Sequence, residues 1–180
     1  LEIPEIKIIT PRRFADERGF FSETWNQAAL AEAGLDLTFV QDNHSLSKDV
    51  GVVRGLHFQT PPFAQDKLLR VTSGAILDVV VDIRVGSPTY GNHVSCEISA
   101  DNWQQILVPK GFAHGFCTLK PNTEVLYKVT APYAPEHDKG LAWDDPALDI
   151  DWGMSPDKAL LSEQGKNHPK LADLPAYFRV

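Results

Sequence analysis

The segment from Ala75 to Arg84 limits the possible folds more than any other part of the sequence. Every second residue from Ala75 to Ile83 is apolar, and the residues between them alternate apolar and charged side chains. Successive side chains of a β-strand point to opposite faces, so this period of two predicts a strand with one wholly apolar face. It is the clearest strand in a sequence in which β signals dominate.

Other short segments of strand-like composition recur along the chain. They are Ile6–Thr10, Leu37–Gln41, Val52–Phe58, Lys67–Thr72, His93–Ile98, Gln104–Val108 and Thr123–Thr130. Turn signals rich in glycine and proline separate them, for example Thr60-Pro61-Pro62 and Gly86-Ser87-Pro88. Many short strands with such turns are typical of a sandwich or barrel. About eight antiparallel strands predict a mainly β jelly roll.

Two short helical segments are also predicted. Asn26 can cap a helix that ends at Gly34, and Ser155-Pro156 can open a helical turn that runs through Leu161. A chain of 180 residues has the length of one domain, and it shows no repeat or linker. We therefore expect a single domain over residues 1–180, with a segment of about 144–180 wrapping the barrel.

The charge balance argues against several classes of partner. Seventeen Lys and Arg against 24 Asp and Glu give a net charge of −7, whereas nucleic acids and anionic membranes require a basic face. No apolar stretch reaches the ~20 residues of a membrane span, and no signal peptide is visible. Cys96 and Cys117 have no pairing or metal-ligand spacing, which indicates two reduced thiols and a cytoplasmic location.

Two histidines stand in segments that suggest chemistry. His57 follows Gly55, which allows a close backbone approach, and His114 lies between small residues within Pro109–Phe116. Histidine suits general-base work because its pKa lies near neutral pH. Taken alone, His57 is more often a surface or hydrogen-bonded core residue.

Lys67 and Tyr127 each have two interpretations. An inward-pointing Lys67 would offer a cation to a developing oxyanion, but a solvated lysine at a strand end is the commoner case. Tyr127 is either a core tyrosine or a proton donor whose hydroxyl reaches a cavity.

The segment Pro109–His114 has a pattern found in cupin barrels, some of which bind metals. A metal cupin needs several histidines and a glutamate on one ion, and Gln59 stands where a second histidine would be expected. We therefore expect no metal, although the chain has four further histidines, His44, His93, His137 and His168.

Taken together and in order, these motifs resemble those of the dTDP-4-dehydrorhamnose 3,5-epimerase family. The resemblance covers nearly the whole chain. It includes Phe14–Phe21, Gln41–Ser45, Arg54–Gln59, Gln65–Arg70, Asp78–Arg84, Ser87–Thr89, Pro109–Phe116, Leu126–Lys128 and Tyr133–Pro135. Each motif is weak alone, and their conjunction is specific to the family.

The resemblance implies a cupin-type jelly roll (a double-stranded β-helix) that is usually a homodimer and uses neither a metal nor a cofactor. It implies the substrate dTDP-4-dehydro-6-deoxyglucose, in which C3 and C5 flank the C4 ketone. A base removes a proton from one face, cations hold the enolate oxygen, and an acid returns a proton to the opposite face.

The resemblance also assigns roles to individual residues. His57 is similar to the base, Tyr127 to the acid, and Lys67 and Arg54 to the cations that hold the sugar or enolate oxygens. Tyr133 would stack on the thymine. The other residues expected to line the nucleotide and sugar site are Arg18, Glu23, Gln41, Asn43, His114 and Asp138.

One segment departs from the family pattern. Where the family commonly has Ser-x-Lys-Asp, with the Asp paired to the catalytic histidine, this chain reads Ser162-Glu163-Gln164-Gly165. A carboxylate behind a histidine fixes its tautomer and raises its basicity. We hypothesise that Asp78, Asp82, a shifted Glu163 or a water molecule replaces it.

Two other functions remain open, and a third fails on its ligand count. A relative that inverts only C3 or C5 of a related deoxysugar would use the same residues. A sugar-nucleotide-binding cupin with little activity would fit the loss of the carboxylate at Gly165. It would not explain why His57, Lys67 and Tyr127 are all present. A metal-dependent cupin oxygenase has too few ligands in this sequence.

Overall fold

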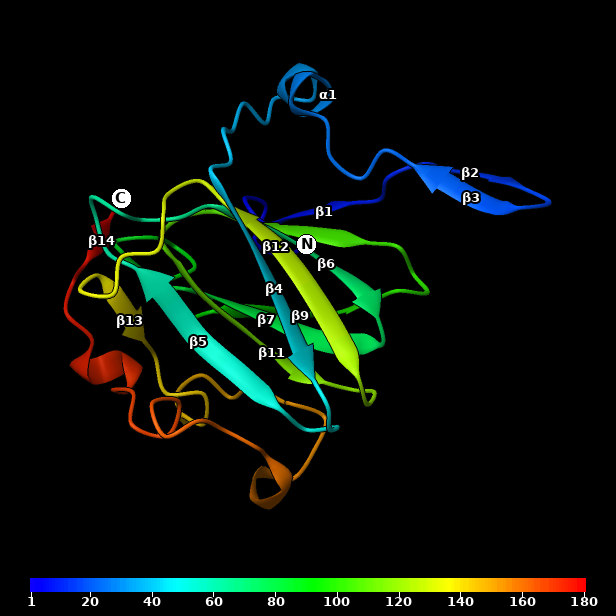
Figure 1. Ribbon diagram of the computed structural model, residues 1–180. Helices are drawn as coiled ribbons and strands as arrows, with labels where there is room; N and C mark the ends of the chain where they lie inside the picture. The colour runs from blue at the N-terminus through cyan, green and yellow to red at the C-terminus, as the bar shows by residue number, and fades with distance from the viewer.

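The computed structural model describes residues 1–180, and most of its strands form two five-stranded antiparallel sheets that pack face to face (Figure 1). The first sheet has the order β1 (Lys7–Ile9), β10 (Gln105–Val108), β6 (Lys67–Ser73), β12 (Thr123–Val129) and β4 (Gln41–Ser47). The second has the order β13 (Asp138–Gly140), β5 (Val53–Gln59), β11 (Phe112–Thr118), β7 (Ala75–Asp82) and β9 (His93–Ser99). Because most neighbouring strands are far apart in sequence, this is the predicted jelly roll.

Smaller elements lie around the two sheets. They are the hairpin of β2 (Arg13–Asp16) and β3 (Gly19–Ser22), helix α1 (Gln27–Glu32), the parallel pair of β8 (Arg84–Val85) and β14 (Phe178–Arg179), and the 3₁₀ turns η1 (Pro156–Lys158) and η2 (Leu171–Asp173). The hairpin projects from the body (Figure 1), and Phe20 packs edge to face on Trp103 with 5.0 Å between ring centroids. No helix of the structure has the length and apolar character needed to cross a membrane.

Two hydrophobic clusters hold the fold together, one on each face of the second sheet. Between the sheets, Leu69 and Val125 pack with Ile76, Val80 and Phe112. On the outer face, the cluster includes Leu56, Val79, Val81, Leu141, Trp143, Leu148 and Trp152. The wholly apolar face of β7 is therefore covered by the later part of the chain rather than by the first sheet.

The local predictions were confirmed in most places and wrong in three. Leu37–Gln41 is not a strand, because β4 begins only at Gln41. The segment Phe14–Phe20, whose sequence predicts a strand-end loop, lies within the hairpin of β2 and β3. Asn26 caps α1 as predicted, but Ser155 makes no capping bond and only a 3₁₀ turn follows.

Candidate active site

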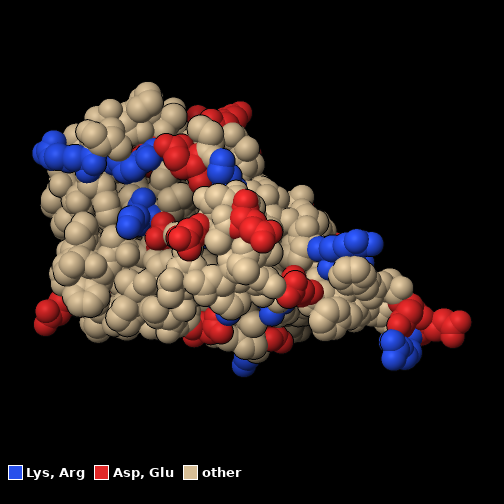
Figure 2. Space-filling view, turned by 90° about the horizontal axis from the view of Figure 1, so that it is seen from above, with Lys and Arg blue, Asp and Glu red and all other residues tan.

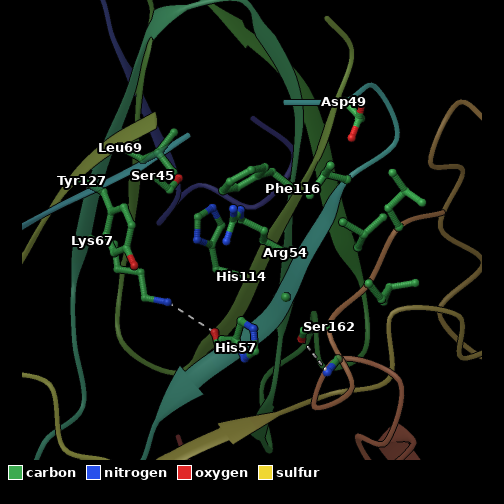
Figure 3. A pocket seen from close by; sticks show the side chains of 17 residues that line it. Ser45, Asp49, Arg54, His57, Lys67, Leu69, His114, Phe116, Tyr127 and Ser162 are labelled. Atoms are coloured by element: carbon green, nitrogen blue, oxygen red, sulfur yellow. Dashed lines mark hydrogen bonds between the residues drawn. The ribbon is translucent and has the colours of Figure 1, made fainter. Parts of the chain in front are cut away.

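A cavity of about 580 Å³ opens between the two sheets and is lined by residues of both (Figure 3). Arg54 and His57 reach it from β5, His114 from β11, Lys67 from β6 and Tyr127 from β12. A neighbouring cavity of about 220 Å³ shares His57, Lys67 and Tyr127 with it. Cavities of this size accommodate small-molecule ligands with a few placed polar groups.

Two glycines bring β5 and β11 unusually close together. A Cβ on Gly55, whose φ is +126°, would lie 2.5 Å from the Cα of Gly115, and a Cβ on Gly115 would lie 2.6 Å from the carbonyl oxygen of Arg54. His57 and His114 are register partners across this contact. In the sequence Arg-Gly-Leu-His, the glycine therefore allows the close approach to β11, and the histidine two residues later lies beside His114.

Burial keeps the imidazole of His57 uncharged. Desolvation lowers its pKa to about 4, and the charges of Lys67, His168 and His114 act in the same direction. Its Nδ1 is buried without a hydrogen-bond partner. A neutral imidazole is the form that accepts a proton, so His57 has the protonation state that a base requires at neutral pH.

Lys67 lies buried beside His57 and has an unusual pKa for a lysine. Desolvation lowers that pKa to about 8, partly opposed by the negative charges of Asp138 and Asp78. Its Nζ donates a hydrogen bond of 3.4 Å to the carbonyl oxygen of His57. The ammonium remains mostly charged at pH 7 and faces the cavity (Figure 3).

Tyr127 enters the cavity from the sheet opposite His57. Burial raises the pKa of its phenol, a shift that Arg54 opposes and Asp138 supports. Tyr127 is therefore protonated at neutral pH and able to donate a proton. The structure thus brings the predicted base, cation and acid to one cavity.

His114 has a different neighbour from His57. Its Nε2 lies 2.8 Å from Oδ2 of Asp78, and both side chains are buried. Arg54 donates hydrogen bonds to Ser47 Oγ and to the carbonyl oxygen of Leu46. These contacts hold both side chains at the cavity wall.

The smaller cavity contains the other predicted polar residues. Gln41 donates to Asn43 through Nε2 and accepts a bond from the backbone N–H of Tyr133 through Oε1. The hydroxyl of Tyr133 donates to Asp138 at 3.4 Å. These four residues form a connected polar wall next to His57, Lys67 and Tyr127.

Arg18 and Glu23 lie away from both cavities of this chain. Arg18 is at the end of the exposed hairpin, where it pairs with Asp16 at 2.6 Å. Glu23 accepts a hydrogen bond from Asn26. The remaining nine predicted site residues line the two cavities.

Gly165, which stands where the family commonly has Asp, also lines the larger cavity. None of the carboxylates proposed to replace that Asp does so. Asp78 pairs with His114, Asp82 with Arg84, and Glu163 with Lys166. The hypothesis that one of them partners His57 was wrong, because Nδ1 of His57 has no hydrogen-bond partner in the structure.

The sequence argument missed His168. Its ring meets that of His57 edge to face, with 5.2 Å between centroids. His168 lies in a C-terminal segment without regular secondary structure, so no strand or helix period could have pointed it at the site. No group of three or more His, Cys, Asp or Glu side chains is arranged to hold a metal ion.

Comparisons with known proteins agree with this geometry. The family described as dTDP-4-dehydrorhamnose 3,5-epimerase matches residues 1–173. A dTDP-4-dehydrorhamnose 3,5-epimerase of Sinorhizobium fredii is 54% identical over 179 residues, which is 99% of this chain and 91% of that protein.

Two solved structures show the range of activities on this fold. The dTDP-6-deoxy-D-glucose-3,5-epimerase of Legionella pneumophila, in complex with dTDP-4-keto-L-rhamnose, superposes with a TM-score of 0.95 at 41% identity and covers 100% of this chain and 96% of its own. A 3'-monoepimerase from Streptomyces bikiniensis, in complex with dTDP-quinovose, has a TM-score of 0.85 at 31% identity and covers 93% and 84%. The fold, the cavity residues and the end-to-end match agree: this chain belongs to the dTDP-4-dehydrorhamnose 3,5-epimerase family.

Proposed function

We propose that this protein converts dTDP-4-dehydro-6-deoxy-D-glucose into dTDP-4-dehydro-L-rhamnose by inverting C3 and C5. The observation that carries the proposal is the placement of His57 and Tyr127 on facing sheets of one cavity, with the Lys67 ammonium beside them. Inversion at carbon requires a base and an acid on opposite sides of the substrate ring.

The reaction follows from these three groups. The Nε2 of neutral His57 takes the proton from a carbon next to the C4 ketone, and the electron pair of the broken C–H bond moves onto the ketone oxygen. The Lys67 ammonium stabilises that oxyanion in a buried site where charge interactions are strong. Tyr127 then gives its proton to the opposite face of the same carbon. Exchange with solvent returns both residues to their starting forms before the second carbon reacts.

The remaining predicted residues are assigned to the nucleotide and the sugar. Arg54 supplies a cation for diphosphate or sugar oxygens, and Gln41, Asn43 and Asp138 supply polar contacts. Tyr133 is 58% exposed, so its ring is free to stack on thymine. A few converging cations thus allow an acidic protein to bind an anionic ligand.

The exposed hairpin supports a homodimer. Phe14, Phe20 and Phe21 are all at least half exposed on β2 and β3, which is costly for a projecting arm in water. Figures 1 and 2 show the arm extending from the body. In our proposal it packs on a second copy and carries Arg18 and Glu23 toward that copy's cavity.

The two free thiols, Cys96 and Cys117, are consistent with a cytoplasmic location, which we include in the proposal.

A coupled assay tests the proposed function. The protein is incubated with dTDP-4-dehydro-6-deoxyglucose, NADPH and a reductase that forms dTDP-rhamnose. We expect NADPH oxidation with the wild type. With His57→Asn we expect its rate to fall about 10²–10⁴-fold, because the substitution removes the general base. His93→Asn is the matched control, because His93 lies on β9 and lines neither cavity. Formation of a product inverted at one carbon only would instead establish a monoepimerase.

A further inference from the structure

Two neighbouring imidazoles each bury one nitrogen that has no hydrogen-bond partner. They are Nδ1 of His57 and Nε2 of His168. Unpaired buried polar atoms are rare and costly, and a pair of them on touching rings calls for a common explanation. The other ring nitrogen of each histidine is not buried in this way.

The fold holds the two rings together through Gly140. Gly140 is the register partner of His57 in the pairing of β13 with β5. The ring of His168 lies directly on Gly140, so closely that a Cβ at this position would overlap the ring. The backbone N–H of Ala142 donates to the carbonyl oxygen of Pro169 at 2.8 Å and fixes the chain next to His168.

The charged groups around this pair leave His168 as the available partner. Lys67 and His114 also face His57, but a lysine ammonium has no acceptor and His114 is paired with Asp78. Asp138 acts on His168 rather than directly on His57. Ring centroids 5.2 Å apart are compatible with a nitrogen-to-nitrogen hydrogen bond of about 2.9 Å.

We propose that His168 is a positioning residue, whose Nε2 accepts a hydrogen bond from Nδ1–H of His57, directly or through one water, and so presents the Nε2 lone pair of His57 to the substrate. The inference rests on the proposed function, in which His57 is the base. Catalytic hydrogen bonds are often long in the free enzyme and tighten when ligand binds. Donating this bond from Nδ1–H selects the tautomer in which Nε2 is the base.

His168 also connects this pair to solvent. It lines a further cavity of about 250 Å³ together with Asp138, Gln164 and Asn167. When His57 takes a proton from carbon, it becomes positively charged. The ring of His168 then shares part of that charge, close to the further cavity and to the carboxylate of Asp138. The imidazole of His168 thus supplies the hydrogen-bond acceptor for His57 that the family's aspartate would supply at the position of Gly165.

The tautomer of His57 is the most direct readout. Two-bond proton–nitrogen NMR spectra of protein labelled with ¹⁵N at histidine distinguish a protonated Nδ1 from a protonated Nε2. We expect wild-type His57, free and with dTDP bound, to carry its proton on Nδ1. In His168→Phe, which keeps an aromatic ring but no acceptor, we expect a mixture of tautomers.

Kinetics and a conservative variant complete the experiment. In His168→Phe we expect kcat to fall about 10- to 100-fold with KM unchanged, as for other imidazoles that lose an orienting partner. His168→Asn retains an acceptor and should recover part of both kcat and the wild-type tautomer. His93→Phe is the matched control, and thermal melting of each variant confirms folding.

The outcomes separate this inference from the proposed function. An unchanged His57 tautomer and an unchanged kcat in folded His168→Phe would overturn the role of His168. The NMR result requires only dTDP, so it stands even if the sugar nucleotide proves to be a poor substrate.

Discussion

His57 and Lys67 are buried together, and burial disfavours the charged form of both. The pKa of His57 falls to about 4 and that of Lys67 to about 8. Between these values His57 is neutral and Lys67 is charged, which is the combination that proton abstraction and enolate stabilisation require.

The pH dependence of kcat/KM follows from these two values. We expect activity to rise as pH increases through about 4, where His57 loses its proton, and to fall above about 8, where Lys67 does. In Lys67→Met we expect kcat to fall about 10²–10³-fold, as when an oxyanion donor is removed. The acid limb should also move to higher pH, because the positive charge that lowers the pKa of His57 is gone. Steady-state kinetics from pH 3.5 to 9.5 measure both effects, and an acid limb near 6.5 in the wild type would contradict them.

The contact of β5 with β11 is an element-scale feature that places two histidines at once. In Gly55→Ala the new Cβ would meet the backbone of Gly115 at 2.5 Å, so the strands must separate. We expect a loss of about 1–3 kcal/mol in unfolding free energy from the strained backbone, and a larger loss from the clash. Activity should fall too, since His57 and His114 move.

Gly19→Ala is the control for this prediction. Gly19 has a φ of +131°, close to that of Gly55, but nothing lies within 4 Å of a Cβ there. Chemical denaturation of the two variants separates backbone strain from steric overlap. Equal losses of unfolding free energy in both variants would show that steric overlap between β5 and β11 adds nothing to the cost of Gly55→Ala.

A second element-scale feature is the carboxylate at the end of β7. Burial opposes ionisation of Asp82, but hydrogen bonds from Arg84, Ser87 and Thr89 outweigh it and lower the pKa to about 2. A lowered pKa stabilises the fold at pH values above that of the unfolded chain, about 3.8, and the contribution is lost as pH falls toward 2.

We therefore expect Asp82→Asn to cost about 3 kcal/mol in unfolding free energy at pH 7, because it leaves Arg84 without its buried partner. The difference from wild type should shrink as the pH is lowered from 4 to 2. Urea denaturation at pH 7, 4 and 2.5 measures it, and a difference that does not change with pH would contradict the role given to the carboxylate.

At the scale of the whole molecule, the projecting hairpin is the feature that a single chain does not explain. Phe21 is 70% exposed on this arm. If the arm packs on a second copy, Phe21→Asp should convert a dimer into a monomer and lower kcat/KM, because Arg18 and Glu23 then lose the partner cavity. Sedimentation velocity measures the change. Phe14→Tyr, which keeps a large ring, serves as the control, and a wild type that sediments as a monomer would refute the proposal.

The sequence predicted the sheets and most of the cavity for a physical reason. Alternation along Ala75–Ile83 and the motif around His57 are local patterns, and local patterns are readable along one strand. His168 was missed because it reaches the site from an irregular segment and depends on the missing Cβ of Gly140. The hairpin was missed because its exposed phenylalanines give no alternation between buried and solvated faces.

The measurement that tests the central claim most directly is proton exchange in D₂O. The protein is incubated with dTDP-4-dehydro-6-deoxyglucose, and C3 and C5 are observed by NMR. We predict deuterium at both carbons of an inverted product, because in the proposed mechanism His57 removes both protons and Tyr127 delivers solvent deuterons. In Tyr127→Phe we predict that deuterium still enters while inversion is lost. Deuterium at only one carbon of the wild-type product, or at none, would contradict the account.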